Sequence, residues 1–129
     1  MIEYEILTKG QQFEIRALRR PQDDESLVKQ YLNSLQQRQQ KKLHRAIQYM
    51  ADRGHAHNSE KCKKISGHNN LFELKEKPCR LVCFYDSHRR YVIVITHGFD
   101  KKGDPTPRSE IDRAIELRES YLSKFGKAN

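Results

Sequence analysis

Five side chains stand near the expected ends of three neighbouring strands, where they could act on a phosphate. Lys75 ends one apolar segment, Arg80 begins the next, and His97, Lys101 and Lys102 follow the third. An ammonium group neutralises a phosphate, and a guanidinium can hold two of its oxygens. Histidine exchanges a proton near neutral pH. These residue types suit either a basic binding surface or an active site for a phosphodiester, and composition alone favours neither.

Four nearby residues could join this group. Lys63 and Lys64 precede the first of the three strands and add positive charge. Phe99 could stack on a base or pack beneath the final helix. Glu73 lies within the strand segment "LFELK" and could act as a base or pair with a neighbouring lysine. We favour pairing for Glu73.

Other chemistries fit the sequence less well. His55, His57, Cys62 and His68 share one polar loop but lack the paired spacing of a zinc site. Cys83 has apolar strand spacing and is expected to be a small buried hydrophobe rather than a nucleophile. The sequence contains no P-loop, GxSxG, HExxH or GxGxxG motif. We therefore expect neither a metal nor a cofactor.

The composition favours a basic cytoplasmic protein that binds a polyanion. The chain of 129 residues suits one domain, residues 1–129, with a net charge of +8 and a pI of about 9.5. Residues 31–71 hold eight Lys or Arg against two Asp or Glu, which favours nucleic acid first and an anionic membrane second. No apolar run reaches the ~20 residues of a membrane span, and no secretory signal is visible. Three cysteines, an odd number, favour free thiols in a reducing cytoplasm.

The first half of the chain is expected to form a hairpin and two helices. "IEYEIL" and "FEIRALRR" alternate around a glycine-containing turn, which predicts a β-hairpin. Asp23 or Asp24 could cap a helix, and a break near residues 33–37 separates it from a second helix that ends at Gly54. The second helix presents basic side chains away from its apolar face: Lys41, Lys42, Arg45 and Arg53.

The second half is expected to form a meander and a last helix. Residues 55–70 form a loop by composition, and strands follow at residues 71–75, 80–86 and 91–96. Their short connections predict antiparallel neighbours. The last helix should begin near Thr106–Pro107. The predicted fold class is α+β, with helices packed on one face of a largely antiparallel sheet.

A series of short motifs runs through residues 63–122 in a fixed order. The chain contains Lys63-Lys64-Ile65, Leu71-Phe72-Glu73-Leu74, Arg80-Leu81-Val82, His97-Gly98-Phe99, Lys101-Lys102, Thr106-Pro107, Glu110-Ile111 and Ala114. This series resembles the phage-derived branch of the RelE/HigB toxin family. The upstream helical pair fits that family as a pattern, and the N-terminal hairpin matches it least.

The resemblance implies a fold, an activity and partners. The fold would be RelE-like: a helical hairpin packed on a small, twisted, mainly antiparallel sheet, plus a C-terminal helix. The protein would be the toxin of a type II toxin–antitoxin system, an mRNA endoribonuclease acting in the ribosomal A site. Its partners would be mRNA, the ribosome and an antitoxin, in this branch often a helix-turn-helix protein, which represses the operon. Operator DNA would then be contacted only through the antitoxin, and no membrane is involved.

Two departures from the family pattern bear on activity. The family's arginine in the E-L-R motif is Lys75 here, which keeps the charge but loses bidentate geometry. The segment after Lys101 reads "KKGDPTP", so one basic residue of the family pattern is missing and Asp104 intrudes. Both changes could weaken catalysis or redirect the target.

The resemblance also implies roles for individual residues. The substrate's 2′-hydroxyl would be the nucleophile, so the protein must orient the phosphate and stabilise added negative charge. Arg80 would clamp the phosphate, Lys75, Lys101 and Lys102 would add charge, and His97 would act as acid or base or make a structural hydrogen bond. RNA contacts would come from Lys63, Lys64 and Phe99, and from the basic helix with Lys41, Lys42, Arg45 and Arg53.

Two other classes of function remain open from the sequence. A ParE-like toxin would share the fold but inhibit gyrase. The Lys101-Lys102 pair and Arg80 favour the nuclease, whereas the two departures slightly favour the gyrase inhibitor. A plain nucleic-acid-binding module would use the same basic residues without a reaction.

Overall fold

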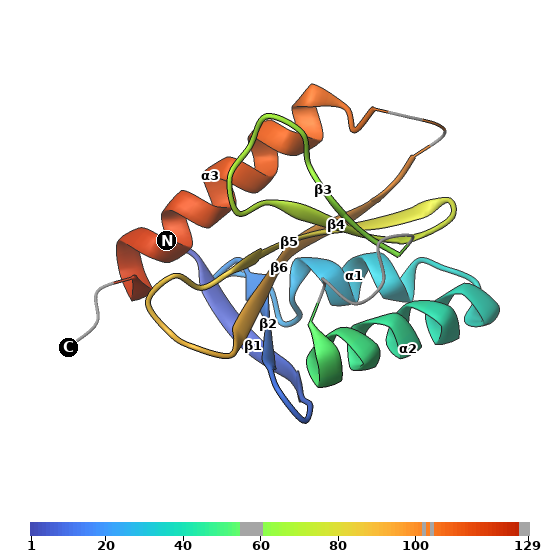
Figure 1. Ribbon diagram of the computed structural model, residues 1–129, viewed down its shortest axis with the longest axis horizontal. Helices are drawn as coiled ribbons and strands as arrows, with labels where there is room; N and C mark the ends of the chain where they lie inside the picture. The colour runs from blue at the N-terminus through green and yellow to red at the C-terminus, as the bar shows by residue number, and fades with distance from the viewer. Residues whose placement is uncertain (55–60, 102, 104, 127–129) are drawn as a thin grey trace.

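A computed structural model describes residues 1–54, 61–101, 103 and 105–126 (Figure 1). Its elements in chain order are β1 (Glu3–Lys9), β2 (Glu14–Arg19), α1 (Leu27–Asn33), α2 (Gln37–Arg53), β3 (Cys62–Lys64), β4 (Phe72–Glu76), β5 (Cys79–Tyr85), β6 (Val92–Asp100) and α3 (Arg108–Phe125). No helix in the described part of the chain is long and apolar enough to cross a membrane.

The strands form one mixed sheet of six strands in the order β1-β2-β6-β5-β4-β3. The predicted N-terminal hairpin is present as the antiparallel pair β1–β2, and the predicted meander is present as β4–β5–β6. The hairpin joins the meander through a parallel pairing of β2 with β6. The sheet is therefore mainly antiparallel, with one parallel junction between β2 and β6.

The helices cover both faces of this sheet, so the prediction that they pack on one face was wrong. Helices α1 and α2 lie on one side and α3 lies on the other (Figure 1). The reason is that the central strands are buried on both faces: every residue of Cys79–Phe84 and of Val92–His97 is buried. Strands of that kind need apolar cover on each side.

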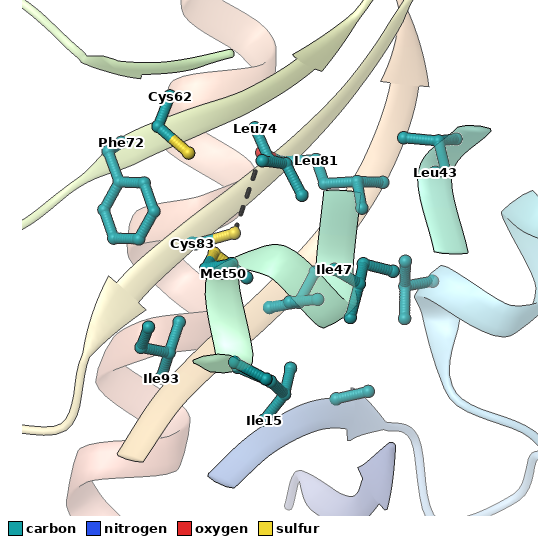
Figure 2. Packing of buried hydrophobic residues seen from close by; sticks show 14 of the residues in the cluster. Ile15, Leu43, Ile47, Met50, Cys62, Phe72, Leu74, Leu81, Cys83 and Ile93 are labelled. Atoms are coloured by element: carbon teal, nitrogen blue, oxygen red, sulfur yellow. Dashed lines mark hydrogen bonds between the residues drawn. The ribbon is translucent and has the colours of Figure 1, made fainter. Parts of the chain in front are cut away.

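Two hydrophobic cores result from this arrangement. On the first face, Leu43, Ile47 and Met50 of α2 pack over strand residues that include Leu81 and Cys83 (Figure 2). On the second face, α3 packs Ala114 and Tyr121 against β-strand residues that alternate with those of the first core. This alternation is the period of two expected for a β-strand.

Two strand boundaries differ from the sequence prediction. Residues 62–64, expected in a loop, form the edge strand β3, which pairs with β4. Strand β6 does not end at Thr96 but continues to Asp100, because residues Cys79–Val82 of β5 pair with this extension. Both segments are too polar to show an apolar strand pattern, and backbone pairing with a neighbour defines them instead.

The helix ends agree with the prediction except at the first cap. Ser26, rather than Asp23 or Asp24, caps α1, because its side chain accepts a hydrogen bond from the Lys29 amide. The Asp23 carboxylate instead accepts hydrogen bonds from Arg20 and Gln30. The expected break between the helices lies between Asn33 and Gln37, and Gly54 ends α2 with φ of 80°.

Candidate functional site

A buried ionic cluster joins β4, β5 and the end of β6 on the α3 face of the sheet. The Glu73 carboxylate lies 3.2 Å from Lys101 Nζ and 3.4 Å from Arg80 Nε. The Thr106 hydroxyl donates to Glu73 Oε2 at 2.5 Å and accepts from Lys101 Nζ at 3.2 Å. Glu73, Arg80 and Lys101 are each less than a tenth exposed. The predicted pairing of Glu73 with a lysine is therefore present, with Lys101 as the partner.

Three members of this cluster, Glu73, Lys101 and Thr106, line a small pocket of about 150 Å³, which we call the Glu73 pocket. Edge strand β3 supplies Lys63 and Lys64, whose side chains are exposed. Because β3 pairs with β4, Lys63 lies opposite Glu73 and comes next to the buried carboxylate, whereas Lys64 lies opposite Phe72. The remaining lining residues come from the segments that follow β3 and β6 and from the first turn of α3: Ile65, Ser66, Pro105, Thr106 and Ile111.

Arg80 does not lie on an open surface as predicted. Its side chain is 3% exposed, and its NH1 group donates to the Cys79 carbonyl at 3.0 Å. Its Nε atom has no hydrogen-bond partner among the described residues, although the Glu73 carboxylate lies 3.4 Å away. The prediction placed Arg80 at the start of a strand, whereas the long β6 places it inside the sheet, between Lys75 of β4 and Phe99 of β6.

His97 is buried and anchors the start of α3. Its ring is 1% exposed, with Nε2 3.0 Å from Glu110 Oε1 and Nδ1 2.9 Å from Thr96 Oγ1. Burial lowers the pKa of His97, the nearby Arg113 charge lowers it further, and Glu110 opposes both effects. Of the two predicted roles, this geometry favours the structural hydrogen bond, and the acid–base role stays a prediction.

The other predicted site residues fall into separate places. Phe99 is 7% exposed and belongs to the core beneath α3. Of its two predicted roles, base stacking and packing beneath the final helix, the structure therefore shows the packing. Lys75 is half-buried opposite Arg80. Lys102 lies outside the described residues. His55 and His57 of the loop considered for a metal also lie outside them, and no group of three metal-binding side chains occurs in the part that is described.

The basic side chains of α2 form a second, separate group. Lys41, Lys42, Arg45 and Arg53 are all exposed. Helix α2 covers the face of the sheet opposite to α3, so these residues do not converge on the Glu73 pocket. The structure thus divides the predicted basic residues between a pocket beside β3 and a helical surface.

Sequence reasoning missed two residues of the site. Thr106 was expected as a helix start and as part of a motif, but its hydroxyl bridges Glu73 and Lys101. Glu110 holds His97 and was noted only as part of a motif. In the sequence, both residues follow closely after Lys101 and Lys102. That position could have suggested a place in the site, but it does not specify a hydrogen-bond partner.

The sequence profile of the family described as phage derived protein Gp49-like (DUF891) matches residues 30–119 of this chain. The match runs from α1 into α3 and includes the Glu73 pocket. The chain therefore belongs to the phage-derived Gp49-like family, which is part of the RelE/toxin-like superfamily. This membership suggests a toxin of the toxin–antitoxin kind. No curated protein matches the chain.

Proposed function

We propose that this protein is the toxin of a type II toxin–antitoxin system and an endoribonuclease that cuts translated mRNA in the ribosomal A site. The α+β fold would then be the RelE-like form of this superfamily. The observation that carries the proposal is the Glu73 pocket, in which Lys63, Lys64 and Lys101 surround a space large enough for a phosphate. Family membership supports the toxin class, and the lysines support a phosphodiester as substrate.

The reaction would use the substrate's own 2′-hydroxyl. The 2′-oxygen attacks the adjacent phosphorus, the bond from phosphorus to the 5′-oxygen breaks, and the products are a 2′,3′-cyclic phosphate and a 5′-hydroxyl. One proton leaves the attacking hydroxyl and one is taken up by the leaving oxygen. This route needs no protein nucleophile, and the protein contributes orientation and positive charge at the phosphate.

The geometry assigns different tasks to the basic residues. Lys63 and Lys64 are exposed at the edge of the sheet and would bind the phosphate directly. Lys101 would hold the phosphate from inside the pocket. Glu73 and Thr106 would fix the position of the Lys101 ammonium group, because both accept hydrogen bonds from it. Arg80 would act as a buried positive charge behind Glu73 rather than as an exposed clamp.

Primer extension on a translated mRNA tests this proposal. The assay compares the wild-type protein with Lys63→Gln/Lys64→Gln and with Arg80→Ala, with and without ribosomes. We expect cuts within codons that require ribosomes and that fall at least tenfold in the lysine variant. The control Lys9→Gln/Arg90→Gln removes the same charge from two exposed residues elsewhere and should cut normally. Absence of cuts from a folded wild-type protein that still stops growth would overturn the nuclease reading.

A ParE-like gyrase inhibitor is the second candidate. The observation that favours it is the pairing of Arg80 and Lys101 with Glu73, because paired cations are less available to a substrate phosphate. A DNA supercoiling assay with purified gyrase distinguishes the two toxins. A plain nucleic-acid-binding module would differ from both, since Lys63→Gln/Lys64→Gln would then change affinity for RNA without any cleavage to lose.

A further inference from the structure

A second pocket of about 200 Å³ lies between α2 and the β3–β4 edge of the sheet. We call it the Tyr49 pocket. Its lining includes Arg45 and Tyr49 from α2, and Lys61, Cys62, Leu74 and Glu76 from the region of β3 and β4. None of these residues belongs to the Glu73 pocket, so the two hollows are distinct.

The apolar part of the Tyr49 pocket suits a flat aromatic ligand. Tyr49 is 42% exposed, one of the few large hydrophobic side chains left at the surface of the described chain. Leu74 and Cys62 are buried and offer an apolar base to the pocket. Burial raises the pKa of Cys62 to about 11, so its thiol is uncharged. A nucleic-acid base stacks on such an aromatic side chain whatever its sequence.

The charges around the pocket favour a polyanion. Lys61 and Glu76 form an ion pair at 2.7 Å and largely offset each other. Arg45 is exposed at the pocket, and the Arg53 guanidinium lies 5.6 Å from the centre of the Tyr49 ring. Helix α2 carries five Lys or Arg against one Asp. An aromatic ring within such a basic surface is the usual combination in single-strand binding sites.

Strand β3 connects this pocket with the Glu73 pocket. Lys61 and Cys62 line the Tyr49 pocket, and Lys63 and Lys64 line the Glu73 pocket. At ~3.3 Å per residue, these four residues cover roughly 10 Å along the strand direction. A single RNA strand of a few nucleotides is long enough to span that distance.

We propose that the Tyr49 pocket is a nucleotide subsite that takes one unstacked base of a single-stranded RNA. The base stacks on Tyr49, a neighbouring phosphate lies at Arg45, and the strand then crosses the lysines of β3. The subsite itself stands on the geometry of α2 and β3. Its role in placing a scissile phosphate in the Glu73 pocket rests on the proposed function.

Fluorescence anisotropy with a labelled single-stranded RNA of about ten nucleotides tests the subsite. We expect Tyr49→Ala to weaken binding about tenfold, or ~1.4 kcal/mol, as for loss of a stacked base. Tyr49→Phe, which keeps the ring, should bind within about twofold of wild type. Arg45→Gln should reduce the slope of log affinity against log salt by about 0.7, the value for one lost phosphate contact, whereas Tyr49→Ala should leave that slope unchanged.

Two substitutions on the β5–β6 turn serve as matched controls. Tyr91 is 58% exposed and Arg90 is exposed, so Tyr91→Ala and Arg90→Gln remove the same groups from another surface. Both should bind RNA as wild type does. Wild-type affinity in Tyr49→Ala would overturn the subsite, as would equal losses in Tyr49→Ala and Tyr91→Ala. If Tyr49→Ala weakens binding of a poly-glutamate peptide but not binding of RNA, the pocket binds an acidic protein segment instead.

Primer extension with the same variants separates this inference from the proposed function. If the wild-type protein cuts translated mRNA and Tyr49→Ala changes neither RNA affinity nor the cut sites, the subsite is wrong and the nuclease stands. If the wild-type protein does not cut but its RNA binding depends on Tyr49, the nuclease is wrong and the subsite stands.

Discussion

At the scale of single residues, Glu73 is the carboxylate on which two buried cations depend. Its removal by Glu73→Ala leaves Arg80 and Lys101 without their opposite charge in a site that water hardly reaches. Loss of one partner from a buried ionic cluster costs about 3–5 kcal/mol. We therefore expect the free energy of unfolding to fall by about 3 kcal/mol, measured by urea denaturation.

The matched control for this prediction lies on the same strand. Glu76 pairs with Lys61, whose side chain is 43% exposed, so Glu76→Ala should cost less than about 1 kcal/mol. Equal effects of the two substitutions would contradict the view that Glu73 stabilises the buried cluster.

His97 gives a prediction about pH. Burial lowers its pKa in the native protein below the usual value of 6.5, so the unfolded chain binds a proton that the native state does not. Stability is then greatest above pH 6.5 and falls as the pH drops from 6.5 through the native pKa. His97→Gln should remove that part of the pH dependence and cost about 1–2 kcal/mol above pH 6.5, where a buried hydrogen bond is lost.

Urea denaturation of both proteins at several values between about pH 5 and 8 measures this dependence. The difference between wild type and variant isolates His97 from the other histidines. Parallel curves for the two proteins would refute a lowered pKa at this site. If cleavage is found, a His97→Gln variant that keeps its rate would leave His97 with a purely structural role.

At the scale of elements, Gly98 determines how closely α1 approaches β6. A Cβ atom at this position would lie 2.8 Å from Leu81 Cδ2 and even nearer to the ring of Tyr31. The single hydroxyl proton of Tyr31 is shared between Asp100 Oδ1 at 2.5 Å and the Phe99 carbonyl at 3.2 Å. Gly98→Ala should therefore destabilise the protein by about 1–3 kcal/mol through overpacking.

A double-mutant cycle with Tyr31→Ala identifies the cause of that loss. Removal of the Tyr31 ring relieves the clash, so the double variant should lose less stability than the two single variants added together. Strict additivity in thermal unfolding would show that the contact with Tyr31 is not the reason for glycine at position 98.

The elements also show which parts of the structure the sequence could predict. The hairpin, the two N-terminal helices and the meander were predictable, because apolar residues repeat at strand or helix spacing there. β3 and the end of β6 were not, because the residues from His97 to Asp100 are held by pairing with β5 rather than by an apolar pattern. The position of α3 on the opposite face of the sheet from α1 and α2 was also missed. The spacing of apolar residues along a helix does not indicate which face of a sheet the helix covers.

The same limit explains the errors in the candidate site. The lysine that pairs with Glu73 is Lys101, which follows β6 and so lies two strands away from β4 in the sheet. The burial of Arg80 depended on the unforeseen length of β6. The bridge from Thr106 depended on the path of the chain after Lys101, for which no local signal exists.

At the scale of the whole molecule, the excess of positive charge lies near the β3 edge of the sheet, between the Glu73 pocket and the Tyr49 pocket. Residues 31–71 contain α2 and β3, and they hold eight Lys or Arg against two Asp or Glu. The Glu73 pocket and the Tyr49 pocket share β3 between them. This arrangement makes the β3 edge, rather than the entire surface, the expected contact with a polyanion.

The distribution of charge predicts an unequal response to charge removal. Lys41→Gln/Lys42→Gln removes two exposed cations from α2, whereas Lys9→Gln/Arg90→Gln removes two exposed cations that lie outside residues 31–71. Both variants have the same net charge. If α2 contacts RNA phosphates, the first variant should reduce the slope of log affinity against log salt by about 1.4, and the second should leave it unchanged. Anisotropy titrations of single-stranded RNA across a salt series measure both slopes, and equal reductions would mean that RNA responds only to the total charge of the protein.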